Sequence, residues 1–139
     1  MDLQLKGKTA LVFGGSKGIG RGIAEALAAE GVAVAIVART KETIDRAVSE
    51  MTGRGWKAIG LSADLANWPA TEAAVKSARE QFGPIDILVN NSGGPPPSGV
   101  VGVKPEVWEA QFHAMVMPFF RVTDMLIGEM RERKWGRIM

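Results

Sequence analysis

Short apolar runs alternate with segments of helical spacing along the whole chain. The first run covers residues 9–13 and is followed at once by Gly14 and Gly15, a pattern typical of a strand that ends in a turn. Beyond the turn, apolar residues recur three and four positions apart, as they do on the buried face of a helix: Ile19, Ile23, Ala24, Leu27 and Ala28. Gly31 is placed to end this helix as its C-terminal cap.

The same alternation continues through the middle of the chain. Further apolar runs predict strands at residues 32–38, 57–61 and 85–89. One helix is expected to begin after Thr40, acting as its N-terminal cap, and to reach residue 52. Another is expected to begin at Asn67 and Pro69 and to reach residue 82. The run at 32–38 is apolar on both faces, which favours a parallel strand covered by helices on both sides.

The last third holds a loop and a long helix. Residues 92–102 contain three prolines and four glycines, which continue neither a helix nor a strand. A helix is predicted from Pro105 to about residue 134, kinked or split at Pro118. Residues 136–139 have the character of a fifth strand that is only begun. The element order predicts an α/β fold: one Rossmann-type domain over residues 1–139, a doubly wound, three-layer parallel sheet of order 3-2-1-4 with strand 5 truncated.

Composition narrows the possible chemistry. The 139 residues include no Cys, no Tyr and a single His, His113; thiolate catalysis, a phenolic proton donor and a histidine metal cluster are therefore excluded for this sequence. The net charge is +2 with both signs interleaved, so nucleic acid is not an expected partner. No apolar run approaches the roughly 20 residues of a membrane span, and residues 1–8 lack a signal-peptide pattern. We expect a cytoplasmic protein without a membrane partner.

Candidate ligand-binding residues follow the first predicted strand. They are Gly14, Ser16, Lys17, Gly18, Ile19 and Gly20. Gly14 permits a tight turn, Gly18 allows a pyrophosphate to approach the backbone, and Gly20 allows close packing of the helix. The N-terminus of that helix adds unpaired N–H groups and partial positive charge. A glycine-rich turn without a ligand is the alternative, and it leaves so specialised a segment without a purpose.

The spacing Gly-x-x-x-Gly-x-Gly resembles that of the short-chain dehydrogenase/reductase family, with Phe13 in place of the usual Thr. The resemblance extends over the whole chain. It implies further cofactor-binding residues in two motifs, an adenine-binding pair after the third strand and an Asn-Asn-Ala-Gly-like signature after the fourth: Asp64, Leu65, Asn91, Ser92 and Gly93. Trp108 and the segment 135–138 also match the family's pattern. Residues 93–97 are similar to a divergent branch labelled 3-oxoacyl-carrier-protein-reductase-like, which suggests a substrate class.

The resemblance also implies what this chain does not contain. The family's catalytic Ser, Tyr and Lys lie after the fifth strand, beyond residue 139, and the family's helix Asn falls on Met115. We therefore assign no catalytic residue here and expect the chain to be inactive alone. His113 shares its helix with several aromatic residues and is expected to pack or to face solvent.

Arg39 and Lys17 bear on the choice of cofactor. An NAD-selective site has an acidic residue at the end of the second strand, to bind the ribose 2′-hydroxyl; here Arg39 stands there, and a guanidinium suits a 2′-phosphate. Lys17 can add a second positive charge. We expect NADP(H) to be preferred over NAD(H). The alternatives are two solvated surface cations, or an Arg39 that pairs with Glu42.

Three functional interpretations remain. The leading one is the NADP(H)-binding part of a short-chain oxidoreductase, which transfers hydride between nicotinamide and a small carbonyl or alcohol substrate. The others are a non-catalytic dinucleotide-binding protein or sensor, and an interaction module that uses the fourth strand. That strand is expected to have an unpaired edge, with exposed aromatic residues on the long helix: Trp108, Phe112, Phe119 and Phe120. Both features predict a homo-oligomer.

Overall fold

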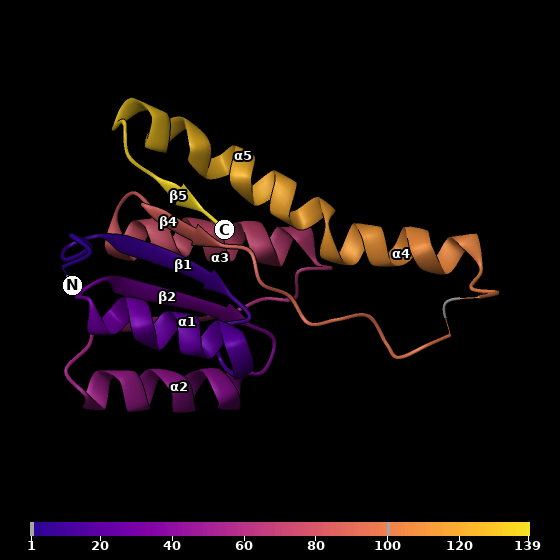
Figure 1. Cartoon of the computed structure of the whole chain (residues 1–139), viewed down its shortest axis with the longest axis horizontal. Helices are drawn as coiled ribbons and strands as arrows, with labels where there is room; N and C mark the ends of the chain where they lie inside the picture. The colour runs from indigo at the N-terminus through magenta and orange to yellow at the C-terminus, as the bar shows by residue number, and fades with distance from the viewer. Residues whose placement is uncertain (1, 100) are drawn as a thin grey trace.

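A computed structural model describes residues 2–99 and 101–139. Within them, one parallel sheet has five strands in the order β3-β2-β1-β4-β5 (Figure 1). The strands are β1 Thr9–Phe13, β2 Ala33–Ala38, β3 Ala58–Ser62, β4 Ile87–Val89 and β5 Arg137–Ile138. The helices are α1 Gly18–Ala29, α2 Lys41–Gly53, α3 Trp68–Phe82, α4 Pro105–Met115 and α5 Met117–Glu132. The predicted doubly wound α/β fold and its strand order are confirmed.

Helices cover both faces of the sheet, as the doubly apolar strands require. On β1, Ala10 and Val12 belong to the core cluster on one face, and Leu11 and Phe13 belong to the cluster on the other. Helices α1 and α2 pack on the first face, and α3 and α5 on the second (Figure 1). All four of these strand residues are at most 1% exposed. Burial on both faces explains why the strands read as continuous apolar runs rather than as alternating ones.

Two of three predicted helix caps are present. Gly31 follows the end of α1 with a φ of +82°, a conformation that favours glycine. The Asn67 side chain accepts a hydrogen bond from the Ala70 N–H at 3.2 Å and caps α3. The prediction for Thr40 was wrong in its chemistry, because Thr40 precedes α2 but its side chain makes no capping bond. The Thr40 backbone carbonyl lies 2.9 Å from the Thr43 hydroxyl, within hydrogen-bond distance.

The long predicted helix is split. Helix α4 ends at Met115 and α5 begins at Met117, with Pro118 in the first turn of α5, where a missing N–H costs least. The two parts differ in burial. Helix α5 buries Pro118, Val122, Leu126 and Met130, whereas α4 buries no residue.

The predicted open edge of the fourth strand is not found. Strand β5 pairs with β4 in parallel register, and the Met139 N–H donates to the Leu88 carbonyl at 2.9 Å. Further along, the Asn90 N–H donates to the Met139 carbonyl at 2.7 Å. Strand β4 has three residues, so the short β5 suffices to pair it. The outer edge belongs instead to β5, where Ile138 is 40% exposed.

Candidate functional site

A cleft of about 900 Å³ lies where the carboxyl ends of β1, β2, β3 and β4 meet. In open α/β sheets, ligands bind in this position. The cleft is lined by eleven of the twelve residues predicted to bind a cofactor: Gly14, Ser16, Lys17, Gly18, Ile19, Arg39, Asp64, Leu65, Asn91, Ser92 and Gly93. Gly20 is the twelfth, and it is buried beneath the loop. The fold therefore gathers four separate sequence segments around one cavity.

The glycines of the loop meet two different demands. Gly14 and Gly18 have positive φ values of +63° and +58°, which L-residues with side chains rarely adopt. A Cβ on Gly18 would meet no atom within 4 Å, so the space beside its backbone is open to a ligand. Gly20 differs, because a Cβ there would overlap the Gly14 carbonyl and lie 2.7 Å from the Asn91 side-chain nitrogen. Gly18 leaves room for a ligand, and Gly20 allows the loop to close on itself.

Asn91 fastens the glycine loop to the fourth strand. Its side-chain Nδ2 donates to the Phe13 carbonyl at 3.3 Å, directly before the turn. The same nitrogen occupies the space that side chains at positions 14 and 20 would need. This contact joins residues 78 positions apart in sequence. Asn91 therefore holds the glycine loop in place in addition to lining the cleft.

The cations around the loop fall into two groups, those with a carboxylate partner among the described residues and those without one. Arg21 bonds Glu25 at 2.8 Å and also Glu50, and these two hydrogen-bonded carboxylates raise the pKa of Arg21. Lys41 bonds Asp45 at 2.6 Å, a partner that likewise raises the pKa of Lys41.

Lys17 and Arg39 belong to the second group. Both line the cleft, and neither forms an ion pair within residues 2–99 and 101–139. The considered pairing of Arg39 with Glu42 is thus absent from the described part of the chain. Two unpaired positive charges remain beside the open face of the glycine loop, where an anion would meet them.

Several cleft residues were missed by sequence reasoning. Thr43 lines the cleft and its hydroxyl lies within hydrogen-bond distance of Ser16 Oγ, at 3.2 Å. A threonine in the first turn of the helix after Arg39 was a usable signal. The opposite wall receives Gln111, Ala114 and Met115 from α4. Met115 is the position that the resemblance matches to the family's helix Asn, whereas no local pattern distinguishes Gln111 and Ala114.

His113 does not belong to the cleft lining. It is exposed and lies edge-on to its neighbour Phe112.

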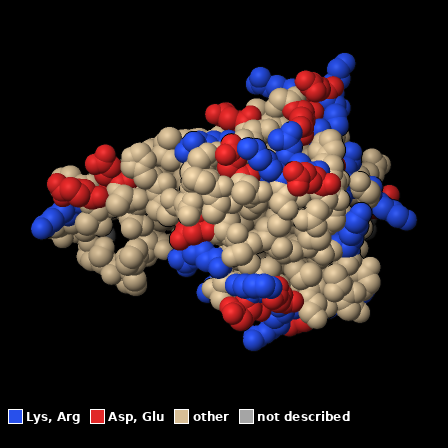
Figure 2. Space-filling view, turned by 180° about the vertical axis from the view of Figure 1, so that it is seen from behind, with Lys and Arg blue, Asp and Glu red and all other residues tan. Residues whose placement is uncertain are grey.

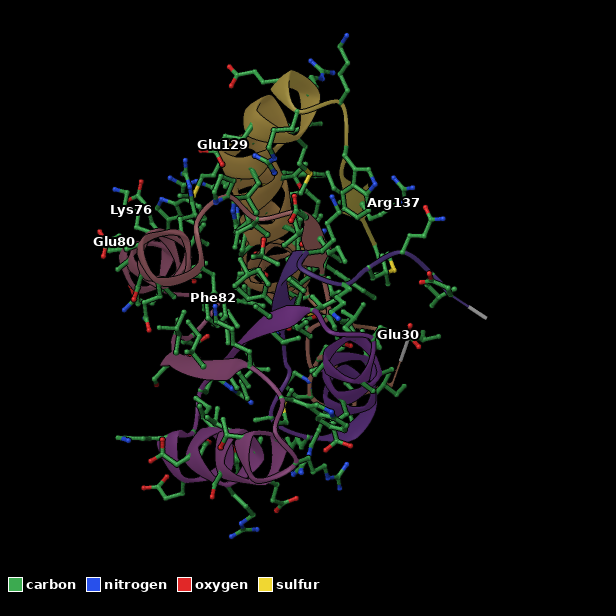
Figure 3. The ribbon with its side chains drawn as sticks, turned by 90° about the vertical axis from the view of Figure 1, so that its left-hand side faces the viewer. Glu30, Lys76, Glu80, Phe82, Glu129 and Arg137 are labelled. Carbon is green, nitrogen blue, oxygen red and sulfur yellow. The ribbon has the colours of Figure 1, made fainter. Side chains whose placement is uncertain are left out.

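A second, smaller depression of about 350 Å³ lies away from the glycine loop, between the end of α3 and α5. Figure 3 shows Lys76 and Glu80 on α3 and Glu129 on α5 around it. Three of its four charged lining residues form ion pairs: Lys76 bonds Glu72 on the same helix, and Arg79 bonds Glu129 across the two helices. The Arg79–Glu129 ion pair joins α3 to α5 beside this depression, and we assign it a structural role rather than a ligand.

The described residues show no further candidate site in the form of a one-signed charged stripe or a cluster of metal ligands. Lys, Arg, Asp and Glu are interspersed on the face seen in Figure 2, without a stripe of one sign. Among the residues that the structure covers, no group of three or more His, Asp or Glu could hold a metal ion. No helix in this part of the chain is long and apolar enough to cross a membrane.

Comparison with known proteins gives consistent matches. The family model described as short chain dehydrogenase matches residues 8–139. An uncharacterized oxidoreductase, YvrD, from Bacillus subtilis is 37% identical over 139 residues, which are all of this chain and 52% of the relative. The 3-oxoacyl-(acyl-carrier-protein) reductase FabG of Escherichia coli is 35% identical over 99% of this chain and 55% of its own length.

A solved structure agrees with these matches. L-sorbose reductase from Gluconobacter frateurii, complexed with NADPH and L-sorbose, superimposes with a TM-score of 0.91 at 34% identity. The match covers 99% of this chain and 53% of that one. The chain thus spans about half the length of the relatives it matches.

Proposed function

This chain belongs to the short chain dehydrogenase family, and we propose on that premise that its 139 residues form one NADP(H)-binding unit of an oxidoreductase. The substrate class proposed for the whole enzyme is a small carbonyl compound or the corresponding alcohol. Two relatives are reductases by name, one of them of 3-oxoacyl groups. A 3-oxoacyl-like substrate is the narrower proposal.

The cleft fits a dinucleotide. Its volume of about 900 Å³ lies within the range of small-molecule and cofactor sites. The open backbone at Gly18 stands at the N-terminus of α1, where N–H groups and the helix dipole favour a phosphate. We assign the pyrophosphate to this point, the adenine to Asp64 and Leu65, and the nicotinamide side to residues 91–93 and the wall formed by α4.

The observation that carries the NADP(H) preference is the state of Arg39. It directly follows β2, lines the cleft and has no carboxylate partner in the described residues. An unpaired guanidinium can bind a 2′-phosphate through two hydrogen bonds, whereas the ribose hydroxyl of NAD offers no charge. Lys17, across the loop, supports the same phosphate.

The residues of this chain hold and orient the cofactor, and they do not supply the reaction's proton. When bound, the nicotinamide supplies or accepts the hydride exchanged with the substrate carbon. The sequence contains no Tyr, and Met115 on the cleft wall has no proton to donate. We therefore propose that this stretch binds cofactor without catalysing turnover by itself.

An oligomer is part of the same proposal. Four apolar residues spaced four positions apart are 36–59% exposed: Trp108 and Phe112 on α4, Val116 between the two helices, and Phe120 on α5. Such an apolar stripe favours burial against another surface; we propose a second copy of the chain. Phe119, which was expected in this exposed set, instead packs edge-to-face on Phe13 at 6.0 Å.

Titration of NADPH and NADH against the wild-type chain and Arg39→Ala tests the cofactor assignment. Charge-assisted hydrogen bonds contribute about 1.5–3 kcal/mol each, so Arg39→Ala should weaken NADPH binding by about 10- to 100-fold and leave NADH nearly unchanged. Arg46→Ala is the matched control, because Arg46 is exposed on α2 and does not line the cleft. Equal losses for both cofactors would contradict the role of Arg39.

A further inference from the structure

Three hydroxyl- and carbonyl-bearing residues form a small polar chain on one wall of the cleft. Thr43 Oγ1 lies 2.9 Å from the Thr40 carbonyl and 3.2 Å from Ser16 Oγ. Ser16 belongs to the glycine loop and Thr43 to the first turn of α2, 27 positions later. All three residues line the cleft, as Lys17 and Arg39 also do. These hydrogen bonds therefore join the glycine loop to the segment that carries Arg39.

Ser16 is the most buried member of this set. It is 6% exposed, and it is one of two buried polar side chains among the described residues. Among the described residues, its side chain is hydrogen-bonded to the Thr43 hydroxyl. A hydroxyl has one proton to donate and two lone pairs that accept. While Thr43 donates to Ser16, the proton of Ser16 remains available to the cleft.

The single proton of Thr43 has two acceptors, and the choice has a chemical consequence. If it goes to Ser16, then Ser16 can donate to an anion in the cleft. If it goes to the Thr40 carbonyl, Ser16 can donate to Thr43 and presents lone pairs to the cleft, an arrangement that repels a phosphate but accepts from a ribose hydroxyl. Hydrogen bonds in such chains polarise one another. An anionic ligand therefore favours the first arrangement.

We propose that Thr43 is a positioning residue for NADP(H) selectivity, which acts through Ser16 by directing the Ser16 proton toward the 2′-phosphate. This inference rests on the proposed cofactor preference. It adds a residue that does not itself contact the phosphate.

The test compares Thr43→Val with Thr43→Ser in titrations of NADPH and NADH. Thr43→Val should weaken NADPH binding by about 3- to 10-fold, because the Ser16 hydroxyl loses the partner that directs its proton toward the phosphate, and it should change NADH binding by less than twofold. Thr43→Ser should restore the wild-type affinity. Thr52→Val is the matched control, because Thr52 on the same helix donates to the Val48 carbonyl at 2.8 Å outside the cleft.

A double-mutant cycle separates action through Ser16 from direct contact. Ser16→Ala combined with Thr43→Val should bind NADPH no more weakly than Ser16→Ala alone. Fully additive losses, or an NADPH affinity of Thr43→Val within twofold of wild type, would overturn the inference while leaving the cofactor proposal intact. A wild-type chain that binds NADH as tightly as NADPH would overturn both. Should Thr43→Val fail to fold, Thr43→Ala in the same cycle gives the same two outcomes.

Discussion

Helices α1 and α4 border the same cleft and are built in opposite ways. Helix α1 buries Gly20, Ala24 and Ala28 and packs on the sheet. Helix α4 is of nearly the same length, buries no residue, and reaches beyond the sheet (Figure 1). The wall that would hold the cofactor's phosphates is therefore formed by the chain's own packing. The wall assigned to the nicotinamide side is held at its C-terminal end by α5 and carries the exposed apolar stripe. We thus expect this chain to bind the cofactor without catalysing the reaction.

The largest expected effect concerns turnover. We expect the 139-residue chain to oxidise no NADPH with a panel of ketones, because a placed general acid contributes typically 10²–10⁴-fold to such reactions and the residues that line the cleft include no Tyr or His to serve as one. His113 faces solvent outside the cleft lining. NADPH absorbance is the measurement. Turnover above a heat-treated control that disappears in Gly18→Trp would show that the two walls do act together.

The next effect tests how tightly the α1 wall is built. Gly20→Ala should lower the free energy of unfolding by about 1–3 kcal/mol through overpacking and weaken NADPH binding at least tenfold, because its Cβ would displace the Gly14 carbonyl and Asn91. Gly22→Ala is the matched control on the same helix. It meets no atom within 4 Å and should raise stability by about 0.5–1 kcal/mol. Denaturant melts and cofactor titrations give both numbers; similar results for the two variants would contradict the assigned role of Gly20.

A smaller effect is expected on the α4 wall. Phe112→Glu should weaken self-association at least tenfold, since it places a charge within the exposed stripe, while NADPH affinity changes less than twofold. Sedimentation at several concentrations measures the first and titration the second. Leu3→Glu, at a residue 49% exposed but outside the stripe, should leave association unchanged. A wild-type chain that sediments as a monomer at all concentrations would remove the basis for this interface.

The sequence predicted most of the fold because its signals are local. Apolar runs fixed the strands, and Gly31 and Asn67 fixed two helix ends. The glycine spacing placed the loop, and the alternation of strands and helices brought Arg39 and Asp64 to the same sheet edge. These steps require only periodicity and the rule that parallel strands end together.

What escaped prediction depends on contacts between distant residues. The pairing of β4 by so short a β5 was missed, because the length of β4 itself is set by its neighbours. The partial burial of Phe119 against Phe13 depends on how α5 packs on the sheet. The Ser16–Thr43 hydrogen bond joins two elements whose separation no sequence spacing gives. Side-chain hydroxyls acquire roles from such geometry, which is why the sequence suggested a capping role for Thr40 and no role for Thr43.

Phosphorus NMR of NADP⁺ titrated with the wild-type chain tests the central assignment most directly, because the pyrophosphate and the 2′-phosphate give separate resonances. We expect both to shift or broaden, the first through the Gly18 backbone at the start of α1 and the second through Lys17 and Arg39. In Arg39→Ala, the perturbation of the 2′-phosphate should decrease while that of the pyrophosphate persists. A 2′-phosphate resonance that stays unchanged in the wild-type complex, or that responds equally with and without Arg39, would contradict the proposed NADP(H) site.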